Sequence, residues 1–472
     1  MTQRSMTPHR LCYSVVANLT LLGLVVSTFC CLVGRTYANS PSPDGQVRLQ
    51  PLIQFASNTP ISDNSGSGNG TRHFSCQSPN AKAICYGPSQ IRKAYNIQPL
   101  LDDGVTGKGA TIVIVDAFQA PDIQNDLKSF DQAFGLNDTD LNIIAPDGLT
   151  PFDPQNADQV GWSAEISLDV EWAHAVAPDA TIDLVLSKSD EERDLVSAIN
   201  HAIDEDLGDV ITMSFGINET CMAGQQLWHQ AFREATSKGI TLLASSGDTG
   251  AAETSCDGTK PVKAVLYPAV DPFVTAVGGT QLHADLSTGE YHDEVAWNEP
   301  TYQAGTGGGF STSFPKPFYQ NSVNGIGKYR GIPDVSYDAA IGDGGVIVRW
   351  SEAPKGAGFY VVGGTSSGSP QWAGIVALAA QDGKSRIGLL NTTIYSSDQK
   401  PHYSSNFYDV TSGNNSITLP DANNKPVTIE GYSAEPGWDP TTGWGSPQAA
   451  ALVPYLANHN AINLSSSDLA SL

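Results

Sequence analysis

The chain has 472 residues, 40% of them hydrophobic, so it is long enough for one large or two medium domains with a full core. Acidic side chains outnumber basic ones by 49 to 25, for a formal net charge of −24, which excludes nucleic acid as an expected partner because phosphate binding needs a basic surface. The repulsion within such a surface relaxes as carboxylates take up protons, which favours an acidic working environment.

The first segment has the pattern of a secretory signal peptide. Arg4 and Arg10 precede an apolar run from Val15 to Val33, and Ala38 supplies the small residue that closes the segment. This pattern predicts cleavage after Ala38 and removal of residues 1–38. An uncleaved membrane anchor is the alternative, because the apolar run is nearly long enough to span a bilayer. We expect a secreted, extracellular protein with no membrane association after cleavage.

A segment rich in Ser, Asn, Gly and Pro follows, over residues 39–75, and includes the run 64–70. This composition is typical of a mobile linker. We therefore predict that residues 39–85 form a linker or a shortened pro-segment ahead of the folded domain.

Four cysteines remain after residue 38, and an even number behind a signal peptide predicts two disulfides. We expect Cys76–Cys85 and Cys221–Cys256, although the sequence alone permits three pairings. A zinc site is the alternative, but the chain has no Cys-x-x-Cys motif or paired-histidine spacing to support it.

From Tyr86 onward, continuous apolar runs alternate with helical patterns such as residues 195–203. Such runs are typical of strands that are buried on both faces, and their alternation with helices predicts an α/β fold with a doubly wound parallel sheet. Functional groups in such sheets gather at the carboxyl ends of the strands. The predicted strands are residues 110–115, 180–186, 210–214 and 240–245.

Ser366 is a candidate nucleophile, because it lies in a glycine-rich turn (363–370) directly before the apolar stretch 372–378. Glycines let the backbone approach a substrate closely, and a helix N-terminus offers free N–H groups where negative charge could develop. The simpler interpretation is a helix cap. A serine nucleophile also needs a base, and none of the nine histidines is followed by the glycine that a subtilisin-type arrangement requires.

Glu165 and Asp169 are the better candidates for that base. Positions four apart on a helix differ by about 40° around its axis, so the two carboxyls project from one face. His174, at about 180° from Glu165, cannot join them readily. Two like charges held close together raise the proton affinity of one of the two carboxyls. Such a pair can therefore act as a base at acidic pH. The alternative is that the pair lies on a solvated face of the helix. The flanking apolar residues Ile166, Leu168 and Val170 weaken this alternative, because they indicate a partly buried turn.

Asp248 supplies a third carboxyl, between Gly247 and Gly250 and just after the predicted strand 240–245. An aspartate in a turn is the common interpretation. A protonated carboxylic acid at this point could instead donate a hydrogen bond to an oxyanion.

A nucleophilic serine with these three carboxyls resembles the sedolisin family, the serine-carboxyl peptidases. The resemblance extends from about Tyr86 to Pro454. The nucleophile motif of the family is similar to residues 364–370, with Ser367 where alanine often follows the serine. Glu165 and Asp169 fall where the family has its base and supporting acid, and residues 246–250 match the oxyanion aspartate. Four further segments also match the family: 267–269, 275–280, 307–311 and 333–336.

The resemblance implies a subtilisin-like fold, with a parallel sheet sandwiched between helices in a single large catalytic domain. That domain would span residues 86–455, followed by a C-terminal tail, 456–472. The resemblance also implies one structural calcium ion, for which oxygen ligands are appropriate. The implied ligands are the side chains of Asp409 and Asp439 and the carbonyls of Val410, Glu435 and Gly437.

We therefore expect a monomeric, secreted, acid-active serine endopeptidase that hydrolyses proteins or peptides. One departure from the family is that only residues 39–85 stand where most members have a long folded pro-domain. A His-dependent subtilisin-like protease using His174 and an inactive, peptide-binding relative are the alternatives.

Overall fold

The computed structural model describes residues 46–64, 72–461 and 464–472. The predicted signal peptide, residues 39–45 and 65–71 of the predicted linker, and residues 462–463 of the predicted tail lie outside the described residues. Within the described ranges, no helix is both long enough and apolar enough to cross a membrane.

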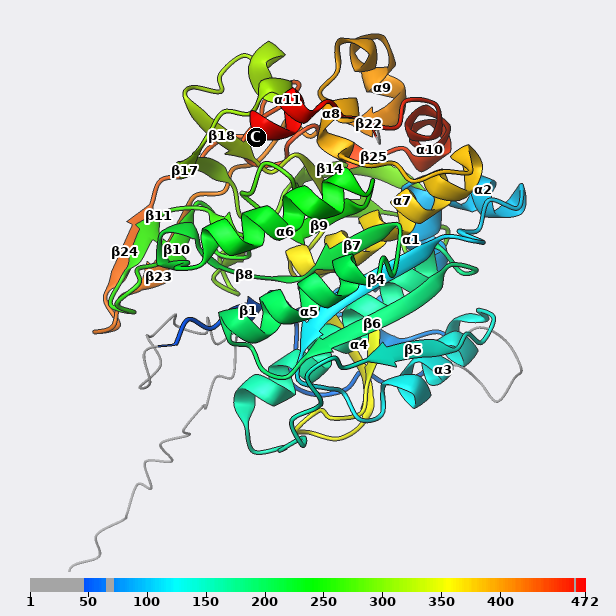
Figure 1. The fold of residues 1–472 in the computed structure, drawn as a ribbon. Helices are drawn as coiled ribbons and strands as arrows, with labels where there is room; N and C mark the ends of the chain where they lie inside the picture. Colours follow the sequence, from blue (N-terminus) through cyan, green and yellow to red (C-terminus); the bar gives the residue numbers. More distant parts are fainter. Residues whose placement is uncertain (1–45, 65–71, 462–463) are drawn as a thin grey trace, which may run out of the picture. The chain divides into compact units, whose positions relative to one another are not determined.

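A central eight-stranded sheet forms the framework of the fold (Figure 1). Its order is β14-β13-β9-β7-β4-β6-β5, with β19 also paired to β13. All pairs are parallel except β13 with β14. The strands are β4 (Thr111–Ala117), β5 (Leu141–Ile144), β6 (Thr181–Ser187), β7 (Val210–Met213), β9 (Thr241–Ser245), β13 (Thr275–Ala284), β14 (Tyr291–Ala296) and β19 (Val335–Asp338). The four predicted strands are confirmed as β4, β6, β7 and β9.

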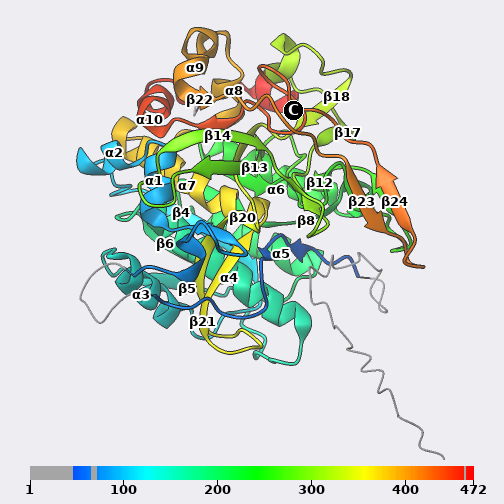
Figure 2. The same cartoon turned by 180° about the vertical axis from the view of Figure 1, so that it is seen from behind.

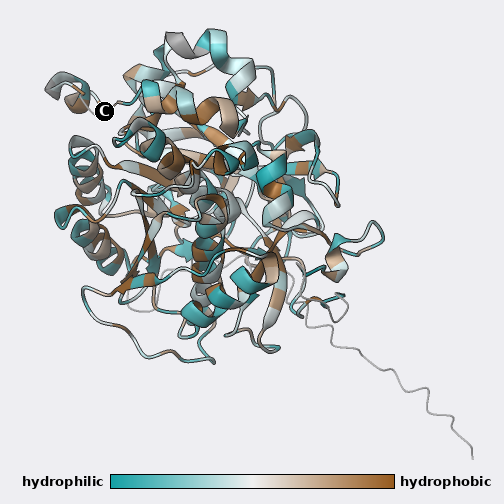
Figure 3. Cartoon of the chain, turned by 90° about the vertical axis from the view of Figure 1, so that its right-hand side faces the viewer, coloured by the Kyte–Doolittle hydropathy of each residue, from teal (hydrophilic) through white to brown (hydrophobic). Residues whose placement is uncertain are grey.

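Helices cover both faces of this sheet, as two opposite views show (Figures 1 and 2). One face carries α5 (Glu192–Asp204) and α6 (Gln225–Ser237), and the other carries α4 (Ala157–Val176) and α7 (Gly368–Gly383). The outer helices α5 and α6 are amphipathic, whereas α4 is buried from Gln159 to Val176. Hydrophobic segments accordingly lie inside and hydrophilic ones outside (Figure 3). The predicted α/β fold is confirmed.

The expectation of a mobile linker is wrong for residues 46–64, because this segment is held between strands. β1 (Gln50–Pro51) pairs antiparallel with β8 (Phe215–Asn218), and β2 (Gln54–Phe55) pairs antiparallel with β21 (Gly358–Gly363). β21 also belongs to a small sheet with β20 (Asp343–Trp350) and β3 (Ile84–Tyr86). The polar composition of the segment did not indicate these strands, because backbone hydrogen bonds to partners far away in the sequence stabilise them.

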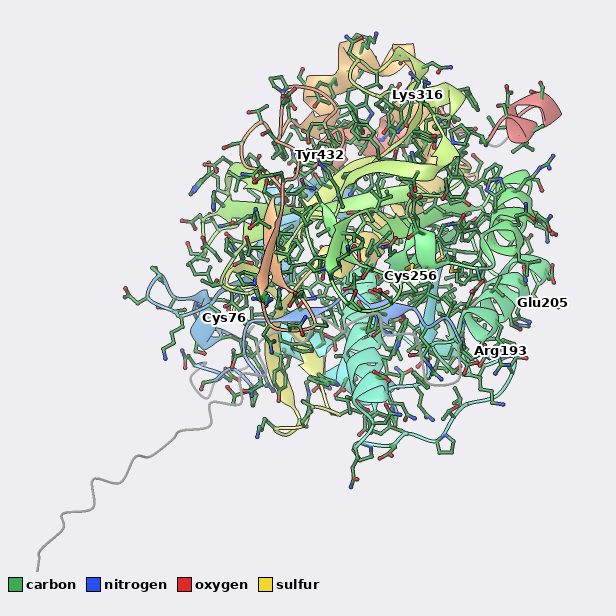
Figure 4. All side chains as sticks on the ribbon, turned by 90° about the vertical axis from the view of Figure 1, so that its left-hand side faces the viewer. Cys76, Arg193, Glu205, Cys256, Lys316 and Tyr432 are labelled. Carbon is green, nitrogen blue, oxygen red and sulfur yellow. A yellow bond between two sulfur atoms is a disulfide. The ribbon has the colours of Figure 1, made fainter. Side chains whose placement is uncertain are left out.

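Both predicted disulfides, Cys76–Cys85 and Cys221–Cys256, are present. Figure 4 labels one cysteine of each pair, Cys76 and Cys256. The first disulfide joins the short helix η1 (Ser75–Gln77) to β3 and so attaches the N-terminal segment to the domain. At the other end, α10 (Ala449–Asn458) continues three residues past the expected domain boundary at 455, and α11 (Ser466–Ala470) follows.

Candidate active site

Ser366 lies in the turn that connects β21 to α7. Gly364 has φ +100°, and the turn continues through η4 (Thr365–Ser367) into the first residue of α7. A Cβ atom on Gly364 would overlap the carbonyl oxygen of Leu52 and the carboxyl group of Asp248. Glycine is therefore required both for the left-handed backbone and for this close approach. The turn places the fully buried Ser366 at the N-terminus of α7, where backbone N–H groups are free.

Glu165 and Asp169 lie on the central turns of α4, next to the Ser366 turn. α4 begins where the Asn156 side chain accepts hydrogen bonds from the backbone N–H groups of Asp158 and Gln159, at 2.9 and 3.2 Å. Both carboxyls are completely buried. The structure thus brings together the serine and the carboxyl pair that the sequence indicated, and it excludes the alternative of a solvated pair.

The environment of Glu165 favours its protonated form. Burial raises its pKa well above the usual range, and the charges of Asp169 and Asp116 raise it further. A contact with Ser366 opposes part of this rise. Neither carboxyl oxygen of Glu165 has a hydrogen bond of good geometry within the described residues. Such a group keeps its proton more readily than a solvated glutamate, and its ionised form is a strong proton acceptor.

Ser214 connects the carboxyl pair to the serine, a role that the sequence analysis missed. Its hydroxyl donates to Asp169 Oδ1 at 2.8 Å, and its carbonyl oxygen accepts a long 3.4 Å hydrogen bond from Ser366 Oγ. Ser214 lies between β7 and β8, just past the carboxyl end of a central strand. That position, with a polar residue ending an apolar run, is the signal that could have indicated it.

Asp116 is a further carboxyl of the site. It lies on β4 and is fully buried, and neither of its oxygens has a hydrogen-bond partner within the described residues. Burial raises its pKa to about 8, and its charge raises the pKa values of Glu165 and Asp169. Asp116 was not among the predicted site residues. The site therefore contains three mutually interacting buried carboxyls, which share protons as one network.

Asp248 lies in the loop after β9 and contacts the Ser366 turn. Its Oδ1 accepts hydrogen bonds from the backbone N–H and the hydroxyl of Thr365, both at 2.8 Å. Burial raises its pKa to about 7, even though these bonds favour ionisation. Its Oδ2 has no hydrogen bond of good geometry to the described part of the chain. At acidic pH, Asp248 is a neutral acid with an O–H available to donate.

His174 is a buried core histidine. Its Nε2 lies 3.2 Å from Asp131 Oδ1 and 3.1 Å from the carbonyl oxygen of Asn137. None of its contacts within the described residues is to Ser366 or to the three carboxyls around it. This placement removes the support for a histidine base.

The segments expected to hold calcium also come together. Both carboxyl oxygens of Asp409 accept from the N–H of Gly437 at 3.1 Å. Asp439 Oδ2 accepts from the N–H of Glu435 at 3.2 Å. Burial raises the pKa of Tyr403, and Asp409 and Asp439 raise it further, which places both carboxylates near one ring. Two carboxylates beside a loop whose backbone carbonyls could also act as ligands suit a hard cation. The described residues contain no cluster of three or more His, Cys, Asp or Glu side chains, so carbonyls would have to complete the ligand set.

The chain is similar to known proteins over most of its length. A profile of the Subtilase family matches residues 160–399. Kumamolisin from Bacillus sp. (strain MN-32) is 32% identical over 81% of this chain and 66% of its own length. Sedolisin from Pseudomonas sp. (strain 101) is 31% identical, with 80% and 63% covered. Tripeptidyl-peptidase 1 from Rattus norvegicus is 28% identical, with 79% and 64% covered.

The chain thus spans slightly less than two thirds of the length of these three relatives. Among solved structures, Pseudomonas sedolisin, a serine-carboxyl proteinase complexed with two molecules of pseudo-iodotyrostatin, superimposes with a TM-score of 0.68. The match has 28% sequence identity and covers 80% of this chain and 99% of that one. The residues that the family profile matches, 160–399, include Glu165, Asp169, Asp248 and Ser366.

Proposed function

Because the chain belongs to the sedolisin family of serine peptidases, we propose that it is a secreted, acid-active endopeptidase with Ser366 as nucleophile. The observation that supports this proposal is that a buried serine lies close to a buried pair of carboxyls. Ser366 and Asp169 are both connected to Ser214, and Glu165 lies close enough to Ser366 for their contact to influence its pKa. A protein or peptide is the substrate class that this chemistry serves.

In the proposed reaction, Ser366 Oγ attacks the carbonyl carbon of the scissile bond while its proton passes to Glu165. Collapse of the tetrahedral intermediate breaks the C–N bond, and Glu165 returns the proton to the leaving amine. Water then hydrolyses the acyl-enzyme by the same route. Asp169, which Ser214 holds in place, orients Glu165 and raises its proton affinity.

Asp248 and the backbone N–H of Ser366 are the proposed donors to the oxyanion. Thr365 occupies Oδ1 of Asp248, so a proton on Oδ2 is the one available for donation. This arrangement needs the neutral acid. Because the pKa of Asp248 is about 7, the donor is present in acid and is lost as the pH rises past that value.

Calcium is proposed as a structural ion that would fix the loop 435–439 against Asp409. Its ligands would be the side chains of Asp409 and Asp439 and the carbonyls of Val410, Glu435 and Gly437. The ion would supply positive charge between two carboxylates, and it takes no part in the proposed chemistry.

Substitutions of two neighbouring serines test the proposed function. Ser366→Ala removes the nucleophile, and we expect hydrolysis of a denatured protein at acidic pH to fall by at least about 10³-fold. Ser367→Ala is the matched control, because Ser367 lies in the same turn and its side chain contacts Gln371 instead of the carboxyls. Equal activity of the two variants would refute Ser366 as nucleophile, and no hydrolysis by the wild-type enzyme would refute the peptidase assignment.

A further inference from the structure

Asn415 is a buried polar residue that the proposed reaction does not use. It lies two residues before β23 (Ile417–Pro420), which forms a hairpin with β24 (Pro426–Ile429). This hairpin packs beside β10 (Ala252–Thr254), the strand that follows the loop carrying Asp248 (Figure 1). Because the side chain of Asn415 is completely buried, its polar atoms need hydrogen-bond partners within the protein.

Both ends of the Asn415 amide have such partners. Its Oδ1 accepts a hydrogen bond from the N–H of Tyr432 at 2.8 Å. Its Nδ2 donates to the carbonyl oxygens of Thr306 and Gly308, both at 3.2 Å. An amide NH₂ group has two hydrogens to donate, and here both are used. These contacts fix the orientation of the amide and attach it to the segment 305–308.

The segment 305–308 lies between Asn415 and the Asp248 loop, residues 246–251. Two of its carbonyls accept from the Asn415 amide, and its Gly305 N–H donates to the Asp248 carbonyl oxygen at 2.9 Å. The Gly305 carbonyl oxygen accepts a hydrogen bond back from the Asp248 loop at 2.8 Å. A shift of this segment would therefore move the backbone of Asp248.

The segment and the Asp248 loop are in close contact. The N–H of Gly307 donates to the carbonyl oxygen of Gly247 at 2.7 Å, and a Cβ atom on Gly307 would overlap the backbone of Ser246. Asn415 also bonds to the loop directly, since its carbonyl oxygen accepts from the N–H of Ala251 at 2.9 Å. Asn415 thus holds the Asp248 loop by two routes, through its amide and through its own main chain.

Asp248 is consequently held at two points. Thr365 bonds to Oδ1 of its carboxyl group, and Gly305 bonds to its main chain. The proposed oxyanion donor works only if its O–H points at the developing charge. Because a displacement of about 1 Å can cost about 10²-fold in rate, the main-chain anchor matters as much as the contact with Thr365.

We propose that Asn415 is a positioning residue of the active site: its amide holds the segment 305–308 against the Asp248 loop and so aligns the Asp248 carboxyl group with the oxyanion. This inference rests on the proposed peptidase function. Within the described residues, none of the hydrogen bonds of Asn415 is to Ser366 or to a carboxyl group of the site. Its loss should therefore act through Asp248 and lower kcat while changing KM little.

Asn415→Ala removes both donors to the segment 305–308. We expect kcat on a peptide substrate at acidic pH to fall by about 10²-fold, with KM changed by less than about twofold, because only the transition state loses a contact. Asn414→Ala is the matched control. Asn414 is the exposed neighbour, and its side chain accepts from the N–H of Ser416 outside the segment, so this variant should keep the wild-type kcat.

The Asp248→Ala background distinguishes alignment of a donor from a general structural role. Without the carboxyl group, alignment of the Asp248 loop no longer matters. Adding Asn415→Ala to Asp248→Ala should therefore lower kcat by less than about threefold. A merely structural role of Asn415 would lower kcat by the same factor in both backgrounds.

Two substitutions of similar size to asparagine test the amide itself. In acid, Asn415→Asp provides a neutral carboxylic acid that can accept from Tyr432 and donate one hydrogen bond to the segment 305–308. Asn415→Leu provides no donor. We expect Asn415→Asp to recover at least about tenfold of the kcat that Asn415→Ala loses, and Asn415→Leu to recover none.

Folding of each variant is checked by circular dichroism and by its Tm. The Thr306 hydroxyl accepts from the N–H of Gly279 at 2.8 Å and donates to the carbonyl oxygen of Thr441 at 3.1 Å, so it still attaches the segment 305–308 to the sheet. If Asn415→Ala nevertheless fails to fold, Asn415→Asp in both backgrounds decides, and equal losses in the two again overturn the inference.

The outcomes separate this inference from the proposed function. If Asp248→Ala loses activity while Asn415→Ala keeps the wild-type kcat, or loses the same factor in both backgrounds, the inference is overturned and the function stands. If Asp248→Ala keeps the wild-type kcat, the donor role of Asp248 is wrong, and the inference falls with it. A wild-type protein that hydrolyses no peptide overturns both the inference and the function.

Discussion

The two carboxyl oxygens of Asp248 have different surroundings. Oδ1 accepts two hydrogen bonds from Thr365, whereas Oδ2 has no hydrogen bond of good geometry within the described residues, although the nearby Gln54 side chain favours the ionised form of the carboxyl group. An asparagine can reproduce this arrangement, because its oxygen can accept from Thr365 while its NH₂ group points where the acid O–H would be. Asn and Ala at position 248 therefore separate hydrogen-bond donation from protonation.

For Asp248→Ala we expect kcat to fall by about 10²–10³-fold at acidic pH, since an oxyanion donor is lost. Asp248→Asn should retain more activity than Ala. Its amide donates at every pH, so the loss of activity near pH 7 should move upward relative to the wild type. Measuring kcat against pH for all three proteins checks this, and an unmoved profile in Asp248→Asn would contradict the donor role.

The sequence contains clear signals for some residues of the site and only weak ones for others. Ser366 and Asp248 could be predicted because glycines surround them at element ends, and Glu165 and Asp169 because helical spacing places them on one face. Asp116 and Ser214 could not be assigned in the same way. Their importance depends on the order of β4 and β7 in the sheet, and a one-dimensional pattern does not specify which strands become neighbours.

At the scale of elements, the apolar strands were predictable and the N-terminal strands were not. β4, β6, β7 and β9 are continuous apolar runs whose burial determines their structure. β1 and β2 contain two residues each, and their partners lie more than 150 residues away in the sequence. Only the folded domain provides the edges that make residues 47–56 extended.

The loop 435–439 is the element whose stability we expect to depend on calcium. Asp409 and Asp439 each accept a hydrogen bond from a backbone N–H of this segment, and a cation bound to both carboxylates would hold it in place. A ligand that binds only the folded state stabilises it by about 2.7 kcal/mol at one hundred times its Kd. Chelation with EGTA should therefore lower the Tm, and added calcium should restore it.

Asp409→Asn should lower the Tm in calcium and remove most of the response to EGTA. Asp138→Asn is the control, since Asp138 is an exposed aspartate whose ion pair with Lys128 is a long 3.7 Å. A wild-type Tm that does not respond to EGTA would contradict a calcium site.

At the scale of the whole molecule, the buried carboxyls connect stability to pH. Burial raises the pKa to about 8 for Asp116, about 7 for Asp248 and about 8 for Glu253. An unfolded chain would release these protons near pH 4. Between pH 4 and these raised values, the folded state binds more protons than the unfolded state, so the free energy of unfolding falls as the pH rises.

We expect the Tm of Ser366→Ala, which cannot digest itself, to be highest in acid and to fall steadily toward pH 8. Each such carboxyl contributes up to about 1.4 kcal/mol per pH unit in this window. Asp116→Asn should make the decline shallower, because it removes one of these groups. Thermal unfolding in calcium-containing buffers checks this, and a Tm that rises from pH 4 to pH 8 would refute the linkage.

The central claim is that a serine works with carboxyls in acid. It is tested most directly by the pH dependence of kcat/KM on a short peptide substrate. We expect a maximum at acidic pH and a steep loss as the pH approaches 7, where Asp248 ionises. A maximum at neutral or alkaline pH would contradict it.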